Sequence, residues 1–280
     1  MPSMIIDFHT HTFPEKIAHQ TIDKLSHAAM IHPFTDGTAE GLLGSMEKAE
    51  IDFSLILPVA TSPRQVESVN EASAELNADD TPLLSYGCMH PEFGDFRAEL
   101  SRVVSLGLRG IKIHPVYQGV DLDDVRFLRI FDRAAELGLS VVTHTGDDIG
   151  YPGVVRCSPQ MAANALREIG DFSLICAHMG GWGVWDEAIQ YLAGTSCLID
   201  TAFSTGFITS IDGKQGDRML SPGQFMKLVD AFGPERILFG TDSPWSDADE
   251  SVRFIKELPL SDEAREKIFY GNAAELGIVE

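Results

Sequence analysis

The sequence lacks a long apolar run and an excess of positive charge, and we expect no secretion signal. Its longest apolar stretches have the length of a strand, well short of the ~20 residues that span a bilayer, and no basic segment precedes the first one. There are 42 acidic against 21 basic side chains, a formal charge of −21, which disfavours binding to nucleic acid or anionic lipid. We therefore expect a cytoplasmic protein that acts on a small molecule, binds neither nucleic acid nor membrane, and is able to form a homo-oligomer.

Cysteine is scarce and dispersed. None of the four cysteines belongs to a C-x-x-C pair, and three lie in or beside apolar strand candidates, so we expect buried free thiols at Cys88, Cys157, Cys176 and Cys197. Two glycine motifs are also missing. Without a glycine-rich phosphate turn after the first strand, a Rossmann fold is disfavoured, and without a G-x-S-x-G elbow a serine nucleophile is not indicated.

What is present is a regular alternation of apolar runs and helical stretches over 280 residues, with no linker between compositionally different halves. Helical spacing of apolar residues is clearest over 64–77 and 121–137, and glycines follow several of the helical stretches. We predict eight strands, at residues 4–9, 53–59, 83–88, 110–114, 140–144, 173–178, 197–202 and 236–241. Continuous apolar runs about 30 residues apart predict parallel strands with crossover helices, hence an α/β fold with one (β/α)8 TIM-barrel domain over 1–280, elaborated by its βα loops. An open doubly wound sheet is the alternative.

Histidines gather at the ends of these strands, where a barrel carries its chemistry. Five of the nine histidines end strand candidates: His9, His11, His114, His144 and His178. His9 and His11 are two residues apart and share one face of the first strand, a spacing that lets two imidazoles converge on one metal ion.

A closed barrel brings the eighth strand next to the first and places the fifth across from them. His9, His11, His144 and Asp242 can then surround one ion near the barrel axis, while His178 is better placed for catalysis than for obligatory coordination. Satisfied histidines at strand ends are the structural alternative. We expect long loops at 12–37, 146–157 and 203–220 to shape the pocket, the first of them as a lid.

The motifs together resemble the amidohydrolase superfamily, and more narrowly its branch of aminocarboxymuconate semialdehyde decarboxylase and related metal-dependent hydrolases. The resemblance spans the chain and is carried by Asp7-x-His9-x-His11, Gly110-Ile111-Lys112-Ile113-His114-Pro115, Thr143-His144-Thr145-Gly146, Ala177-His178-Met179-Gly180-Gly181, Gly240-Thr241-Asp242-Ser243-Pro244 and Tyr270-Gly271-Asn272-Ala273-Ala274.

The resemblance implies one divalent ion, Zn²⁺ in preference to Mn²⁺ or a similar metal, held by His9, His11, His144 and Asp242. Asp242 and His178 are the implied catalytic groups. Lys112 is interpreted as a fixed cation for a substrate carboxylate or oxyanion; a carbamylated lysine that bridges two ions and a packing role are the alternatives. His114 and Trp182 are candidate substrate contacts, although Trp182 fits helix packing equally well.

The sequence therefore predicts a metal-dependent hydrolase that activates water against a small, carboxylated or cyclic amide or lactone. A decarboxylase that uses the same ion is the first alternative. A metal-binding scaffold without catalysis is the second.

Overall fold

Eight parallel strands form the barrel in the computed structural model, which describes residues 4–78, 80–170 and 172–279. Every predicted apolar run contains a strand, but most strands are shorter than the run and leave its last residues beyond the strand end. The barrel strands are β1 (Ile6–Thr10), β2 (Phe53–Ile56), β3 (Leu83–Ser85) continued by β4 (Gly87–Cys88), β5 (Gly110–Ile113), β6 (Ser140–Thr143), β7 (Leu174–Cys176), β8 (Leu198–Asp200) and β11 (Ile237–Leu238).

Backbone hydrogen bonds join these strands into two parallel sheets. Parallel pairing runs from β1 through β2 to β3, and from β4 through β5, β6, β7 and β8 to β11. The two sheets meet between β11 and β1, where the Phe8 N–H donates to the Phe239 carbonyl at 2.8 Å and the Asp242 N–H donates to the His9 carbonyl at 2.8 Å. The eighth barrel strand is therefore the neighbour of the first, as the predicted (β/α)8 fold requires.

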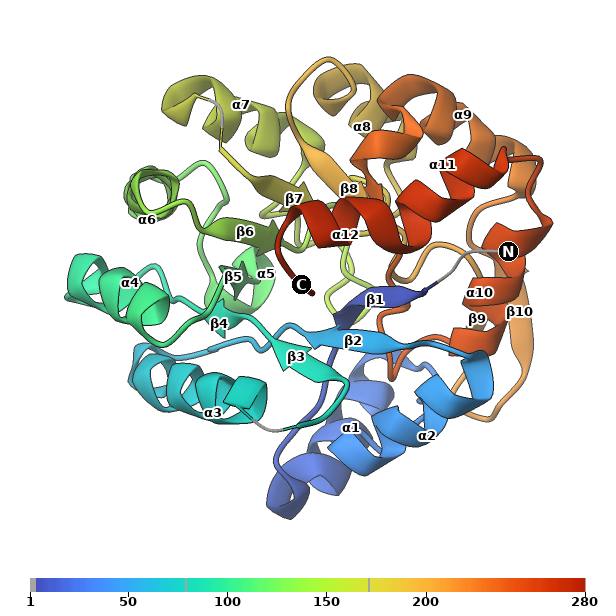
Figure 1. Cartoon of the computed structure of the whole chain (residues 1–280), viewed down its shortest axis with the longest axis horizontal. Helices are drawn as coiled ribbons and strands as arrows, with labels where there is room; N and C mark the ends of the chain where they lie inside the picture. Colours follow the sequence, from blue (N-terminus) through green and yellow to red (C-terminus); the bar gives the residue numbers. More distant parts are fainter. Residues whose placement is uncertain (1–3, 79, 171, 280) are drawn as a thin grey trace.

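Helices surround the strands on the outside, as Figure 1 shows. The predicted helix at 121–137 begins later than expected because the Asp124 side chain caps it by accepting from the Arg126 N–H. In chain order the helices are α1 (Glu15–Ala29), α2 (Ala39–Ala49), α3 (Val66–Ala78), α4 (Phe96–Ser105), α5 (Pro115–Gln118), α6 (Val125–Glu136), α7 (Pro159–Ile169), α8 (Trp185–Leu192), α9 (Pro222–Phe232), α10 (Ala248–Glu257), α11 (Asp262–Glu266) and α12 (Asn272–Glu275), with short 3₁₀ or π segments η1 (Pro63–Gln65), η2 (Pro234–Arg236) and η3 (Lys267–Gly271).

The apolar core has two main layers. The larger layer lies between the strands and the helices and includes Phe127, Phe131 and Phe225. The smaller one contains side chains from six of the barrel strands together with residues of the C-terminal segment: Ile6, Phe8, Leu55, Leu57, Tyr86, Val142, Ile175, Leu238, Ala273 and Ile278. Each fully buried Val, Leu, Ile or Phe side chain in these layers contributes about 1.5–3 kcal/mol, so the main apolar stabilisation comes from residues other than the polar strand ends.

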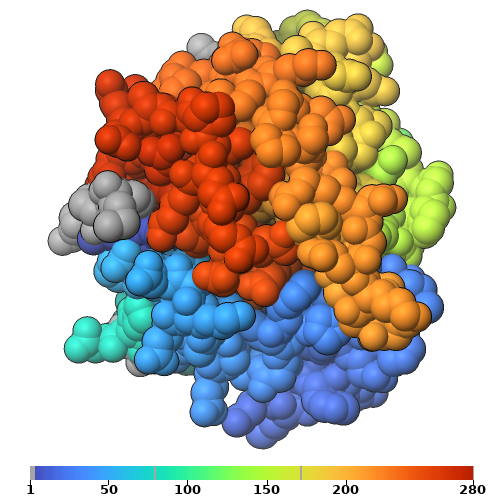
Figure 2. All heavy atoms as spheres, turned by 90° about the vertical axis from the view of Figure 1, so that its right-hand side faces the viewer, coloured from blue at the N-terminus to red at the C-terminus, as the bar shows by residue number. Residues whose placement is uncertain are grey.

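The segment 12–37 was expected to be a long loop, but it contains the 15-residue helix α1. The residues that follow α1 pair with a hairpin that was not predicted from the sequence. This hairpin is formed by β9 (Phe207–Thr209) and β10 (Gln215–Arg218). The His32 N–H donates to the Thr209 carbonyl at 2.9 Å, and the Ile211 N–H donates to the Met30 carbonyl at 3.1 Å. In Figure 2 the orange hairpin region lies directly against the blue N-terminal segment. Two of the three predicted loops therefore form one continuous structure.

Across the part of the chain that the structure describes, every helix is too short or too polar to cross a bilayer.

Candidate metal centre

His9, His11 and Asp242 come together where the first and eighth barrel strands meet. His9 lies in β1 and is buried, His11 follows the strand, and their rings lie 5.1 Å apart. Asp242 follows β11 in a left-handed conformation, with a φ of 65°, and its backbone hydrogen bond to His9 fixes it beside the two rings. Strand pairing therefore brings side chains 231 to 233 positions apart in sequence into one group.

The hydrogen bonds of the two imidazoles determine which nitrogen faces Asp242. His9 Nδ1 lies 2.7 Å from Asp200 Oδ2, and His11 Nδ1 lies 2.9 Å from the Leu57 carbonyl oxygen. Both partners are acceptors, so each Nδ1 carries a hydrogen, and the neutral form of each ring presents a lone pair at Nε2. These Nε2 atoms lie 3.5 Å and 3.1 Å from Asp242 Oδ1.

Two ring lone pairs and a carboxylate oxygen that face one another repel unless a cation lies between them. Burial, with Lys112 next, lowers the pKa of His9 well below its usual value, which keeps the ring neutral. Burial by itself raises the pKa of Asp242, but the neighbouring histidines lower it below its usual value, so the carboxylate is ionised. Two imidazole nitrogens and one carboxylate oxygen are donors that suit zinc and other first-row divalent metals.

Lys112 reaches the same group from β5. Its side chain is buried, and its Nζ lies 3.2 Å from His9 Nε2, so the ammonium donates to the lone pair identified above. Burial lowers the pKa of Lys112 to about 8, opposed by the charges of Asp200 and Asp242. A positive charge therefore already lies at the edge of the site.

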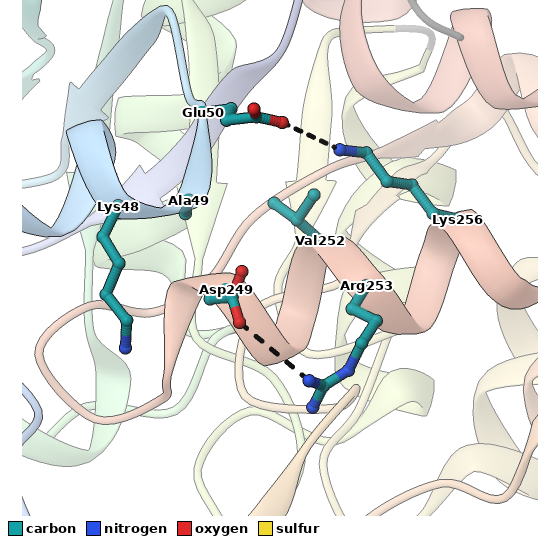
Figure 3. A pocket seen from close by; sticks show the side chains of 7 residues that line it. All are labelled: Lys48, Ala49, Glu50, Asp249, Val252, Arg253 and Lys256. Carbon is teal, nitrogen blue, oxygen red and sulfur yellow. Dashed lines mark ion pairs between the residues drawn. The ribbon is translucent and has the colours of Figure 1, made fainter.

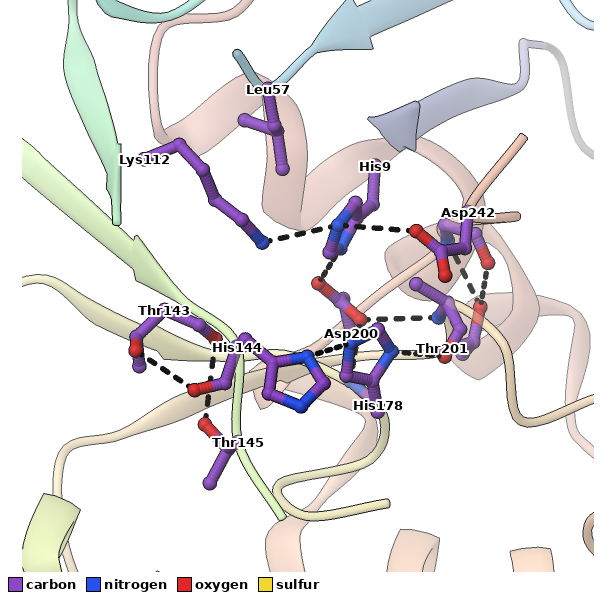
Figure 4. A network of polar contacts seen from close by, with 12 residues as sticks. His9, Leu57, Lys112, Thr143, His144, Thr145, His178, Asp200, Thr201 and Asp242 are labelled. Carbon is purple, nitrogen blue, oxygen red and sulfur yellow. Dashed lines mark hydrogen bonds and ion pairs between the residues drawn. The ribbon is translucent and has the colours of Figure 1, made fainter. Parts of the chain in front are cut away.

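His178 and His144 form a second contact between rings (Figure 4). His178 Nδ1 donates to the Ala202 carbonyl at 2.9 Å, and His144 Nε2 donates to the Asp147 carbonyl at 3.2 Å. The remaining nitrogens, His178 Nε2 and His144 Nδ1, face each other at 3.0 Å. In these tautomers neither nitrogen carries a hydrogen, so the two lone pairs face each other.

The structure brings together three of the four predicted metal ligands, and His144 lies in a neighbouring group. His9, His11 and Asp242 offer donor atoms that are all within 4.8 Å of one another, as do His114, His144 and Asp148. The rings of His114 and His144 are stacked, with centroids 4.4 Å apart and planes at 17°, so their lone pairs lie in nearly parallel planes and are poorly directed at one ion. The role of His144 as a ligand remains a prediction.

The candidate substrate contacts line the same end of the barrel. His114 stacks on Tyr117 with ring centroids 3.8 Å apart, and its Nδ1 is buried without a hydrogen-bond partner among the described residues. Trp182 lies beside Phe203, and its Nε1 donor is likewise unpaired in that part of the chain. His114 Nδ1 and Trp182 Nε1 are each free to form a hydrogen bond with a substrate, so both residues remain candidate substrate contacts.

Sequence reasoning missed Asp200, the last residue of β8, whose side chain is fully buried. It holds His9 Nδ1 and also accepts from the backbone N–H of His178. The signal was present in the sequence, since a carboxylate interrupts the apolar run at 197–202.

A surface groove of about 380 Å³ lies elsewhere, between α2 and α10 (Figure 3). Its cations are paired with acids, Lys256 with Glu50 at 3.5 Å and Arg253 with Asp249 at 4.0 Å. None of the strand-end histidines lines it, so the groove offers no competing catalytic chemistry.

Comparison with known proteins gives a family and a fold. The sequence model of a family described as amidohydrolase matches residues 6–276. No curated protein matches the sequence significantly. An uncharacterised TIM-barrel protein from Bordetella bronchiseptica is similar in structure, with 19% identity, a TM-score of 0.73 and 98% of each chain covered.

Two further structures are similar at low identity. One is a dihydroxybenzoic acid decarboxylase from Polaromonas sp. JS666 with bound manganese and the inhibitor 2-nitroresorcinol (15% identity, TM-score 0.69, covering 99% of this chain and 97% of that one). The other is a proposed 2-pyrone-4,6-dicarboxylic acid hydrolase from Pseudomonas putida (17% identity, TM-score 0.66, covering 100% of both chains).

Proposed function

The chain belongs to the amidohydrolase family, and on that basis we propose that it is a hydrolase that uses one divalent ion to direct water at a small, carboxylated or cyclic amide or lactone. One observation carries the proposal. The Nε2 lone pairs of His9 and His11 converge on the Asp242 carboxylate in a buried site, a set of donors that suits a divalent ion.

His9, His11 and Asp242 would hold the ion, with His144 as the fourth ligand. A divalent ion in such a site acts as a Lewis acid and lowers the pKa of water from about 15.7 towards ~7. We propose Zn²⁺, because two imidazoles and a carboxylate are common zinc donors. Mn²⁺ is the alternative, supported by the manganese in the similar decarboxylase structure.

Residues around the proposed ion would transfer protons and bind the substrate. Asp242 accepts a proton from the attacking water at a carboxylate oxygen. His178 Nε2, which carries no hydrogen at rest and lies 3.0 Å from His144 Nδ1, takes up this proton and passes it to the leaving group, while Nδ1 keeps its hydrogen bond to the Ala202 carbonyl. The Lys112 ammonium binds a substrate carboxylate or the developing oxyanion.

Decarboxylation is the second candidate, because one of the similar structures is a decarboxylase of an aromatic acid. Lys112 would then bind the carboxylate that leaves, and the same histidine would protonate the carbon left behind. The binding residues are common to both reactions, so only the products separate them.

A substrate panel of lactones, amides, unsaturated acids and hydroxybenzoic acids tests the two reactions with the metal-loaded enzyme. Hydrolysis without carbon dioxide supports the proposal, and release of carbon dioxide from an acid supports the second candidate. The His178→Asn variant addresses the scaffold alternative. We expect it to keep the ion and lose at least about 100-fold of the turnover, in line with the usual contribution of a general acid or base. Unchanged turnover in this variant would contradict a catalytic role for His178.

A further inference from the structure

Asp200 contacts both His9, a proposed metal ligand, and His178, the proposed proton-transfer residue, although its own side chain is fully buried. It ends β8, its side chain is fully buried, and Figure 4 shows it between His9 and His178. Oδ2 lies 2.7 Å from His9 Nδ1, and Oδ1 accepts from the backbone N–H groups of His178 at 2.9 Å and Ala202 at 3.1 Å. With no exposure to the pocket, Asp200 cannot touch a substrate.

The backbone that carries His178 is in an unusual conformation that these contacts hold. His178 and Met179 both have positive φ values, 63° and 55°, in the left-handed region that side chains other than glycine rarely adopt. The Met179 N–H donates to the Asp200 carbonyl at 2.6 Å. The Ala202 carbonyl, two residues further on, accepts from the His178 ring. The end of β8 therefore fixes both the backbone and the ring orientation of His178.

We infer that Asp200 is a positioning residue that couples the metal ligand His9 to the proton-transfer residue His178. This inference rests on the proposed function for the roles of those two histidines. One carboxylate oxygen fixes the His9 tautomer, so that Nε2 is a lone pair directed at the ion. The other holds the turn on which His178 lies. A carboxylate that accepts the Nδ1 hydrogen of a metal-binding histidine orients the ring and raises the basicity of Nε2.

The hydrogen bonds of the Asp200 side chain can be tested by replacing it with asparagine, which has the same size. Its two carboxylate oxygens accept three N–H groups, one from a ring and two from the backbone. An asparagine has a single acceptor oxygen, and its NH₂ group can only donate. Asp200→Asn must therefore either lose both backbone contacts or face His9 Nδ1 with a donor, which breaks that hydrogen bond or forces His9 into the Nε2–H tautomer.

The experiment compares wild type, Asp200→Asn and a control, Glu99→Gln, as metal-free proteins titrated with zinc in a calorimeter. Glu99 is a buried carboxylate in α4 that pairs with Asn70 at 2.7 Å and with Arg102 at 2.8 Å, outside the histidine groups. We expect Asp200→Asn to weaken zinc binding about 10- to 100-fold. Glu99→Gln should bind zinc as wild type does.

Ring ¹⁵N spectra of the same metal-free proteins give a second readout. We expect His9 of the wild type to be the Nδ1–H tautomer, and the signals of both His9 and His178 to shift in Asp200→Asn. A wild-type His9 in the Nε2–H tautomer would overturn the inference even if the variant fails to fold.

The remaining outcomes separate the inference from the proposed function. If the wild type binds zinc and Asp200→Asn binds it equally well, the positioning role fails while the proposed function stands. A shift confined to one of the two histidines refutes the coupling between them. If the wild type binds neither zinc nor manganese, the proposed function fails and the inference fails with it.

Discussion

At the scale of single residues, the candidate centre depends on which ring nitrogen of each histidine carries its hydrogen. The acceptors behind His9 and His11 fix Nδ1 as the donor in both rings, so both Nε2 lone pairs point at Asp242. The same rule, applied to His178 and His144, leaves two lone pairs that face each other. The carbonyl and carboxylate groups behind the rings thus determine which ring nitrogens present lone pairs to the site.

Replacing Asp242 tests the charge of the centre. In Asp242→Ala the ion would lose its only proposed anionic ligand, so we expect metal affinity to fall more than about 100-fold and turnover to be lost. The fold should survive, because barrel stability lies in the apolar layers. Calorimetric titration and thermal unfolding measure the two effects, with Asp132→Ala, at an exposed position of α6, as the control. Unfolding of Asp242→Ala at room temperature would refute the separation of site from stability.

The cysteines give a prediction about pH. All four are free and buried, as expected from the sequence. Burial raises the pKa of the Cys88 thiol to about 12, so at pH 8.5 the folded protein should carry about 10³-fold less Cys88 thiolate than an unfolded chain. We expect alkylation of Cys88 by iodoacetamide to be at least that much slower in the native state. Equal rates before and after denaturation would contradict its burial.

The same pKa fixes the sign of a stability change in alkali. Between about pH 9 and 12 the unfolded thiol has lost its proton while the folded thiol keeps it, so the folded state binds more protons and Cys88 lowers the free energy of unfolding as pH rises. Cys88→Ala should remove this part of the pH dependence in denaturant titrations.

At the scale of the elements, the strand ends decide which side chains face the site. Gly146 follows β6 and pairs with Trp182 in an isolated bridge, which fixes the loop after His144 against the loop after His178. Its φ is 92°, and an added Cβ would lie 2.3 Å from the backbone nitrogen of Trp182. Only glycine permits this approach of two backbones.

Gly146→Ala should therefore cost much more stability than an ordinary glycine substitution. We expect a loss of more than about 3 kcal/mol in the free energy of unfolding, from the backbone overlap added to the strain of a positive φ. Gly138→Ala is the matched control: its φ is 68°, but nothing lies within 4 Å of the added Cβ, so we expect about 1–2 kcal/mol. Urea unfolding of both variants gives the comparison, and equal losses would show that the overlap relaxes at no cost.

The repeating elements were predictable from sequence, and the irregular ones were not. Buried parallel strands read as continuous apolar runs, which is why 140–144 and 173–178 each contain a strand. The hairpin of β9 and β10 was missed because its seven residues are exposed or half-buried and include Gln215, Gly216, Asp217 and Arg218. Its strands pair through backbone contacts with each other and with the N-terminal segment, which leave no apolar pattern.

At the scale of the whole molecule, the closure of the barrel explains which site residues could be grouped from the sequence. Placing β1 beside β11 is enough to bring Asp242 to His9 and His11, and that grouping followed from the fold alone. The position of His144 did not follow, because it depends on ring orientations set by Asp147, His114 and His178. Asp200 was missed for a similar reason, since its importance lies in hydrogen bonds between strands far apart in sequence.

Metal binding should stabilise the whole barrel. An ion present at 100 times its Kd adds about 2.7 kcal/mol to the free energy of unfolding. For a chain of 280 residues we expect Tm to rise by roughly 5 °C on zinc loading and to return on chelation. Differential scanning calorimetry measures the shift, with Asp242→Ala as the control that should show little or none. A similar rise in that variant would place the stabilising ion somewhere else.

The most direct test is the metal content per chain of protein purified without added metal and without a metal-binding affinity tag, measured by plasma mass spectrometry before and after reconstitution. We expect about one zinc, manganese or similar divalent ion per chain in the wild type and none in Asp242→Ala. About two ions would favour Lys112 as a carbamylated bridge. No bound ion, even after reconstitution, would contradict a metal-dependent enzyme.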